Sequence, residues 1–116
     1  MEYRKEGNVV VVNSLDEKIL DADAIMDTLM SLKYETGCTC YAIAKSCFDE
    51  SFFRLSSGVA GEVIQKFVNY GIRVSVFGDF SKYTSKPLRD FIYESNKGRH
   101  FGFLASEQEA VSWLCR

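Results

Sequence analysis

Two neighbouring serines are the first residues in this sequence that could carry chemistry. Ser56 and Ser57 are followed by Gly58, and an apolar stripe with helical spacing begins just after them. A serine at the start of a helix accepts hydrogen bonds from the free backbone N–H groups there. A phosphorylated serine would add about −1.5 to −2 charges at the positive end of the helix dipole, which tolerates an anion. These residues are therefore predicted to be either a plain helix cap or a phosphorylation switch.

A second group of reactive side chains lies in a loop that follows an apolar run. Its candidate ligand-binding residues are Asp79, Lys82, Tyr83, Ser85 and Arg89. Open α/β sheets bind ligands beyond the carboxyl ends of their strands, so this position favours a site for phosphate, a small ligand or an acidic peptide. Asp79 is the acid best placed to be a general base, although one carboxylate defines no reaction. The alternative is that these charges belong to a solvated helix face.

The four cysteines and the single histidine do not form a metal-binding or catalytic pattern. Cys38 and Cys40 make a Cys-x-Cys pair with Cys47 nearby, but the paired Cys-x-x-Cys spacing of structural zinc sites is missing and His100 is remote in sequence. No G-x-S-x-G turn supplies a nucleophile for the histidine. We therefore expect free thiols, no metal and no cofactor, with Cys40 and Cys115 buried as small apolar side chains.

The composition is typical of one globular domain that covers residues 1–116. The chain has 14 Lys+Arg and 16 Asp+Glu, a formal net charge of −2, so no overall positive field attracts nucleic acid. No apolar run approaches the roughly 20 residues that span a bilayer. The first residues lack the apolar stretch of a signal peptide. These features predict a cytoplasmic protein that binds neither nucleic acid nor membrane.

The positions of the two candidate groups follow from the predicted order of strands and helices, ββαβαβαβα. Short apolar runs and turn residues predict strands over 2–5, 9–12, 40–44, 72–77 and 101–105. Helical spacing predicts helices over 22–36, 58–70, 87–96 and 107–114. Residues 48–55 are predicted as a helical turn or a loop with Phe52 and Phe53 inward. The order predicts a mostly parallel sheet with an antiparallel hairpin at its start and helices on one or both faces.

Three helices carry clear boundary or packing signals. Asp21 is the expected N-cap of the first helix, and Gly37 ends it. The last helix opens with the Ser-x-x-Glu spacing of a capping box at Ser106. The predicted buried stripe of the second main helix is Val59, Val63, Ile64, Phe67 and Val68, and that of the third is Leu88, Phe91 and Ile92.

The serine segment, together with the element order, resembles the STAS domain of bacterial anti-sigma factor antagonists. In that family a loop reading Asp-Ser-Ser-Gly-apolar-Gly leads into the helix after the third strand, and a partner kinase phosphorylates one of its serines. Ser56 and Ser57 match the two serines and Gly58 matches the glycine. Positions 55 and 60 carry leucine and alanine in place of the aspartate and the second glycine. The resemblance implies a STAS-like α/β fold and a switch at a serine.

Two longer stretches are similar to a bacterial family known as domain of unknown function 4180. They are residues 52–62, running on into 65–67, and residues 88–98. Residues 78–80, Gly-Asp-Phe, and the closing Trp113-Leu114 fit the same pattern. The chain is identified as a member of this family, which brings no assigned activity with it.

Two functions remain open from the sequence. We expect a non-catalytic interaction or regulatory module whose contact surface for a protein partner is Ser56, Ser57 and Gly58. The competing expectation is a small-ligand or phosphate-binding protein, or an enzyme, that uses the loop after Phe77. A convex surface without a deep pocket would favour the first, and a concavity where Asp79 and Arg89 converge would favour the second. Self-association is also open.

Overall fold

The computed structural model describes the backbone of residues 1–54 and 57–116, and the side chains of residues 1–54 and 61–116. In this part of the chain, the strands are β1 (Glu2–Glu6), β2 (Val9–Ser14), β3 (Cys40–Ala44), β4 (Arg73–Phe77) and β5 (Phe101–Leu104). The helices are α1 (Ala22–Thr36), α2 (Ser57–Tyr70), α3 (Lys86–Lys97) and α4 (Glu107–Leu114). Two short 3-10 segments, Lys45–Cys47 and Glu50–Arg54, connect β3 to α2. The predicted order ββαβαβαβα is confirmed.

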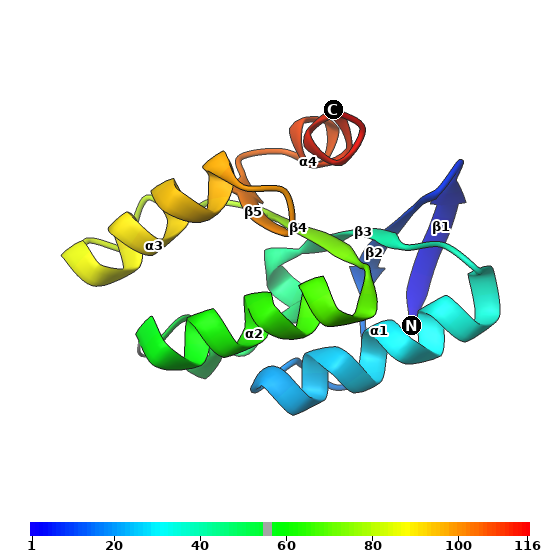
Figure 1. Cartoon of the computed structure of the whole chain (residues 1–116), viewed down its shortest axis with the longest axis horizontal. Coiled ribbons are helices and arrows are strands. Elements are labelled where there is room, and N and C mark those ends of the chain that lie inside the picture. Colours follow the sequence, from blue (N-terminus) through cyan, green and yellow to red (C-terminus); the bar gives the residue numbers. More distant parts are fainter. Residues whose placement is uncertain (55–56) are drawn as a thin grey trace.

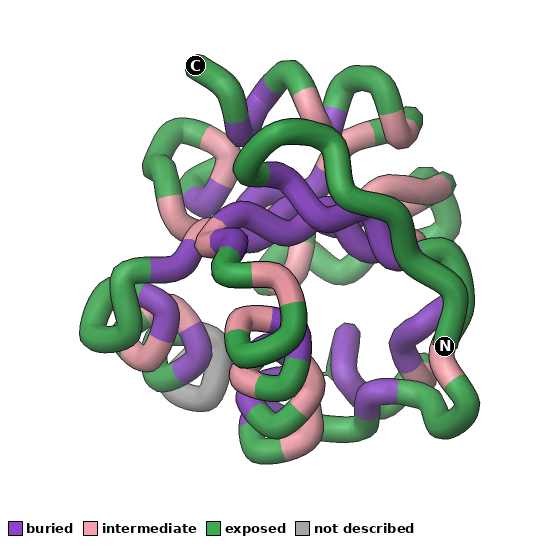
Figure 2. Tube along the Cα trace, turned by 90° about the vertical axis from the view of Figure 1, so that its right-hand side faces the viewer, coloured by how far each residue is buried: buried purple, intermediate pink, exposed green. Residues whose placement is uncertain are grey.

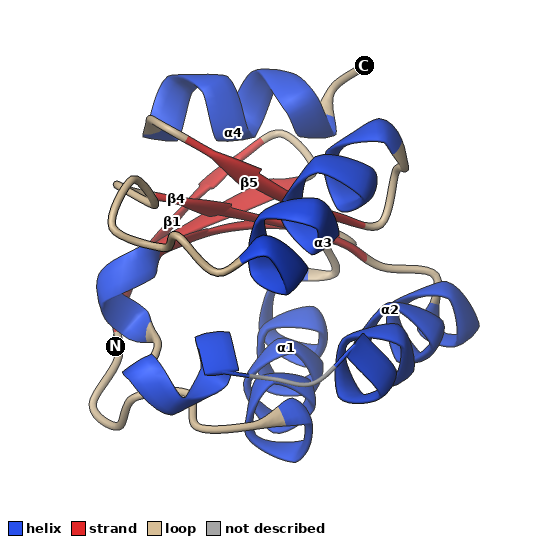
Figure 3. Ribbon diagram, turned by 90° about the vertical axis from the view of Figure 1, so that its left-hand side faces the viewer, coloured by secondary structure: helices blue, strands red, loops and turns tan. Residues whose placement is uncertain are grey.

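The five strands form one sheet in the order β1-β2-β3-β4-β5 (Figure 1). β1 pairs with β2 in the antiparallel sense, and every later pair is parallel. Right-handed crossovers that always step in the same direction place their helices on the same face of a sheet. Accordingly, α1, α2 and α3 pack on one face, and α4 covers the other (Figure 3).

Alternating residues of the strands build the two halves of the core. Val10 and Val12 of β2 join the cluster under α1, α2 and α3, whereas Val9 and Val11 point to the side of α4. This alternation follows from the two-residue period of a strand. Trp113 of α4 closes the smaller cluster. Most buried residues therefore lie in the middle of the molecule, and the outer sides of the helices are exposed (Figure 2).

The ends of α1 form as the local sequence predicts. The Asp21 carboxylate accepts a hydrogen bond from the backbone N–H of Ala24 at 2.9 Å, which satisfies one of the free donors of the first turn. At the other end, Gly37 has φ of 73°, the left-handed conformation that glycine adopts without strain. Both helix boundaries are therefore set by residues adjacent to the helix itself.

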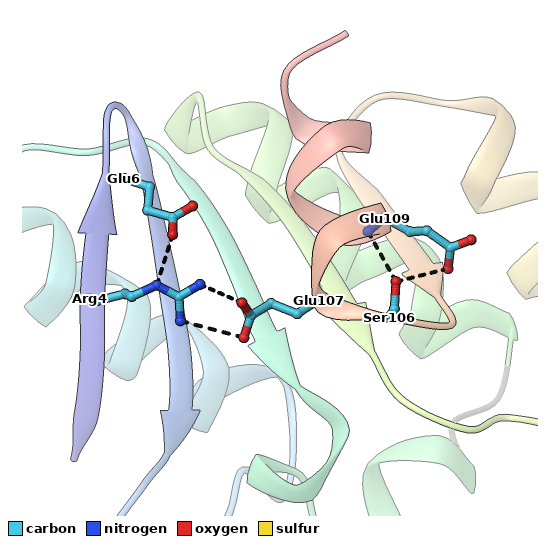
Figure 4. Close-up of polar contacts among 5 residues, drawn as sticks. All are labelled: Arg4, Glu6, Ser106, Glu107 and Glu109. Carbon is cyan, nitrogen blue, oxygen red and sulfur yellow. Dashed lines mark hydrogen bonds and ion pairs between the residues drawn. The ribbon is translucent and has the colours of Figure 1, made fainter.

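The start of α4 carries the predicted capping box and also attaches the helix to the hairpin. The Ser106 hydroxyl oxygen accepts from the backbone N–H of Glu109 at 3.2 Å (Figure 4). Arg4 of β1 donates to the carboxylate of Glu107 in the first turn of α4, and its Nε donates to Glu6 at 2.9 Å. These contacts connect the first strand with the last helix across the sheet.

Two expectations about burial are wrong, and a third, the inward face of α3, holds in part because its residues pack against the core without full burial. Cys115 is exposed, because α4 ends at Leu114 and the cysteine lies beyond the packed turn, although Cys40 is buried as predicted. Val68 is 44% exposed, since it lies on the outer flank of α2 next to the fully buried Phe67. The inward residues of α3 are Leu88, Phe91 and Ile92, and each is only half-buried. They stay partly exposed because α3 lies beside the edge strand β5, and open grooves remain on both sides of the helix.

Candidate functional site

The two predicted groups of residues leave the sheet at the same edge. β3 and β4 are parallel neighbours, with Ala44 opposite Phe77 at their carboxyl ends. The 3-10 segments follow β3 and lead to α2, and the loop over 78–85 follows β4 and leads to α3. The start of α2 and the start of α3 therefore belong to one edge of the molecule.

The serine group lies at the beginning of α2. Ser57 is the first residue of the helix and Gly58 the second, so the prediction that a helix begins at the twin serines is confirmed for the backbone. Ser56 lies outside the described residues, as does the side chain of Ser57. The capping and phosphorylation roles of these hydroxyls remain predictions.

Aromatic side chains connect the 3-10 segment to the loop after β4. Phe52 and Phe53 are buried, which confirms their inward orientation. The ring of Phe53 lies 5.9 Å from that of Phe80 and 5.5 Å from that of Tyr83, measured between centroids. Aromatic pairs at such separations stabilise packing beyond the area that they bury. The loop is therefore held against a rigid apolar layer.

Glu50 is a residue of this site that the sequence analysis missed. Its carboxylate accepts a hydrogen bond from Lys82 Nζ at 2.8 Å through one oxygen and from the Tyr83 hydroxyl at 2.8 Å through the other. The bond from Lys82, and next the bond from Tyr83, lower the pKa of Glu50. Burial, and then the bond to Glu50, raise the pKa of Tyr83. Two of the five candidate ligand-binding residues are thus already engaged.

Asp79 is engaged within its own turn. One of its carboxylate oxygens accepts from the backbone N–H of Ser81 at 2.9 Å. Hydrogen bonds from the Ser81 hydroxyl and from this N–H lower the pKa of Asp79. The bond from the Ser81 N–H stabilises the turn, and a carboxylate with a lowered pKa is a weaker base.

The remaining candidate residues divide between two hollows on either side of Tyr83. The larger one, about 560 Å³, contains Arg89 but not Asp79; its lining is Phe80, Ser81, Tyr83, Thr84, Arg89, Ile92, Tyr93 and Asn96. The second, about 370 Å³, contains Lys82 and Ser85. Ser85 also caps α3 by accepting from the N–H of Leu88 at 3.3 Å. The hollow that contains Arg89 is therefore not the concavity shared by Asp79 and Arg89 that would favour the ligand-binding alternative.

The sheet also lacks the feature that usually places a ligand at such an edge. In open α/β sheets the binding crevice forms where the strand order reverses and neighbouring loops diverge. Here the order runs from β1 to β5 without reversal. The loops after β3 and β4 pack on each other through Phe53 and Tyr83, and the smaller hollow is lined by residues of both loops.

Most of the cysteine side chains belong to the core. All four are free thiols, and Cys38, Cys40 and Cys47 are buried. Burial raises the pKa of the Cys47 thiol, which lowers the fraction of nucleophilic thiolate. Among the described residues, no group of three or more His, Cys, Asp or Glu side chains is arranged to hold a metal ion. Within the same residues, no helix has both the length and the apolar character needed to cross a membrane.

Comparison with known proteins identifies a family and supports the fold. A family model described as "Domain of unknown function (DUF4180)" matches residues 4–114. A solved structure titled "NMR Structure of the protein TM1081" is similar to this chain at 13% sequence identity with a TM-score of 0.51. The match covers 98% of this chain and 87% of the other, and at this identity it shows a likeness of fold alone. A search of curated proteins finds no significant match.

Proposed function

The chain belongs to the family described as Domain of unknown function (DUF4180). We propose that this chain is a non-catalytic regulatory module of STAS-like organisation. In this proposal the module works in the cytoplasm and binds a protein partner at the start of α2. Phosphorylation of Ser56 or Ser57 controls that contact.

The observation that carries the proposal is the engagement of the acids near the start of α2. Asp79 is fixed by Ser81, and Glu50 is fixed by Lys82 and Tyr83. These hydrogen bonds fix the conformation of the surface around the two carboxylates. Because the bonds also lower the pKa of each carboxyl group, the carboxylates accept protons poorly at neutral pH. A rigid edge that carries a helix start suits recognition of a partner better than proton transfer.

The position of the serines supports a switch that leaves the fold intact. The first turn of a helix has free N–H donors and a positive dipole end, so a phosphate there is compatible with folding. The added charge changes the binding of the partner protein rather than the fold. It repels an acidic partner surface, and it disfavours contact with an apolar one.

Substitution of Ser56 by aspartate tests this proposal. We expect Ser56→Asp to reduce the amount of the specific partner captured from native lysate by about tenfold or more, since like charges facing each other across an interface cost several kcal/mol. The control is Ser112→Asp, which adds the same charge at an exposed position of α4 on the opposite face of the sheet. Equal capture by wild type and Ser56→Asp, or equal loss in both variants, would contradict the proposal.

The hollow beside Arg89 supports a second candidate function, binding of a small anionic ligand. Arg89 lines it and makes no ion pair with any residue that the structure describes, whereas Lys82 is paired with Glu50 and Lys86 with Asp90. A guanidinium in a hollow that apolar Phe80 and Ile92 also line suits an aromatic phosphate or carboxylate.

A pair of alanine variants tests this second function with phenyl phosphate as the probe. Arg89→Ala is expected to weaken binding about tenfold, because it removes a charge-assisted hydrogen bond. Lys82→Ala is expected to change affinity less than about twofold, since its amino group is held by Glu50 in an exposed pair. Two-dimensional NMR titration measures both values. Undiminished binding by Arg89→Ala would exclude this site.

A further inference from the structure

A separate groove lies between α2 and α3 and uses a different face of α3 from the Arg89 hollow. It has a volume of about 350 Å³, within the range of small-molecule sites. Its apolar surface comes from Ile64 of α2, Phe91 of α3 and Phe101 of β5. Phe101 is 1% exposed, and Ile64 and Phe91 are half-buried. Phe101 therefore forms the buried floor of the groove, and the side chains of Ile64 and Phe91 form apolar walls that remain partly exposed to solvent.

Ser95 lines this groove and leaves a buried hydroxyl without a partner. Its side chain is 7% exposed, and its Oγ has no hydrogen bond to any described residue. Hydroxyls inside helices usually donate to the carbonyl one turn earlier. In α1, Thr28 donates to the carbonyl of Ala24 at 3.1 Å and Thr36 to that of Leu32 at 2.7 Å. An unpaired buried hydroxyl costs free energy, and a turn of the Ser95 side chain toward the groove would let a ligand there complete the missing hydrogen bond.

The mouth of the groove carries excess positive charge. Glu94 is balanced by Lys97, at 3.7 Å. Arg99 lines the groove and makes no ion pair with a described residue. Nδ1 of His100 lies 3.1 Å from the carbonyl oxygen of Ile72. A carbonyl oxygen can only accept a hydrogen bond, so Nδ1 is the donor and carries a proton. The other ring nitrogen, Nε2, takes no part in this bond.

We propose that the groove between α2 and α3 binds a small carboxylate with an apolar body. The body packs on Ile64, Phe91 and Phe101, and the carboxylate pairs with Arg99. Ser95 contributes a hydrogen bond to a polar atom of the ligand. This site goes beyond the proposed partner switch and does not depend on it, because it uses other side chains and a different class of ligand.

Matched probes test the charge requirement. Hydrocinnamate and hydrocinnamyl alcohol share the same aromatic body and differ in the carboxylate. We expect hydrocinnamate to bind with a dissociation constant of about 1 mM or lower, as a compact ligand of this size permits, and to shift the NMR signals of Ile64, Phe91 and Phe101. The alcohol is expected to bind about tenfold more weakly, because it lacks the charge that pairs with Arg99.

Substitutions at three positions test the geometry. A Cβ added at Gly61 meets no described atom within 4 Å, so Gly61→Leu fills the groove from α2 and is expected to abolish binding, whereas Gly61→Ala retains most of it. Arg99→Gln is expected to weaken hydrocinnamate binding about tenfold and Ser95→Ala about threefold.

The proposal is overturned if the acid and the alcohol bind wild type equally, or if hydrocinnamate gives no saturable shift. Unchanged binding by Gly61→Leu or by Arg99→Gln overturns it as well. Arg99 is exposed, so its variant remains a test even if Gly61→Leu does not fold. Loss of binding here with normal partner capture by the same variants would separate this site from the serine switch.

Discussion

Replacing Phe101 by alanine is expected to lower the free energy of unfolding by about 3–5 kcal/mol. Phe101 is almost fully buried in β5, and its ring contacts four other aromatic rings. Their centroids lie between 4.7 and 6.5 Å away, and they belong to Phe52, Phe67, Phe91 and Phe103. The substitution leaves a cavity where the 3-10 segment, α2 and α3 meet the sheet. The loss is a large fraction of the stability of a domain of this size.

Urea denaturation measures this effect. The matched control is Tyr93→Ala, which removes an aromatic ring that is 63% exposed and is expected to change stability by about 0.5 kcal/mol or less. A loss below about 1 kcal/mol for Phe101→Ala would mean that the aromatic layer is not packed as described.

Replacing Asn96 by alanine is expected to cost about 2–3 kcal/mol. β5 is an edge strand, and the Asn96 side chain takes the place of a further neighbour there. Its amide nitrogen donates to the Phe103 carbonyl at 3.0 Å, and its oxygen accepts from the Phe103 N–H at 2.7 Å. Phe103 is only 5% exposed, so water replaces these bonds poorly once the amide is gone.

The control for Asn96 is an asparagine with a purely local contact. Asn69 is exposed in α2 and accepts from Gln65 one turn away, so Asn69→Ala is expected to change stability by about 0.5 kcal/mol or less. Hydrogen exchange adds a second readout, because the Phe103 amide should lose protection in Asn96→Ala. Equal stability of the two variants would contradict the assigned role of Asn96.

Features set by neighbouring residues could be predicted from the sequence. Asp21 and Gly37 bound α1, and Ser106 opens α4, because caps act on backbone groups within one turn. The mostly parallel sheet with an antiparallel hairpin at its start could also be predicted, since it follows from the alternation of strands and helices along the chain. The start of α2 at the twin serines belongs to the same group of local features.

Contacts between distant parts of the chain could not be predicted. Glu50 is 32 residues from Lys82, and no spacing rule indicates that its carboxylate would hold both Lys82 and Tyr83. Asp79 accepts from the backbone N–H of Ser81 and does not line the Arg89 hollow, and no spacing rule indicates this arrangement. Likewise, the half-buried side of α3 follows from its position beside β5, which sequence periodicity does not report.

Phosphopeptide mapping of the protein purified from its native host tests whether the start of α2 is a phosphorylation switch. We expect a fraction of molecules with one phosphate on the peptide that contains Ser56 and Ser57, and we expect this fraction to change with growth conditions. The partner should be found only with the unmodified molecules. Absence of phosphate from both serines under every condition, or equal recovery of the partner with the phosphorylated form, would contradict it.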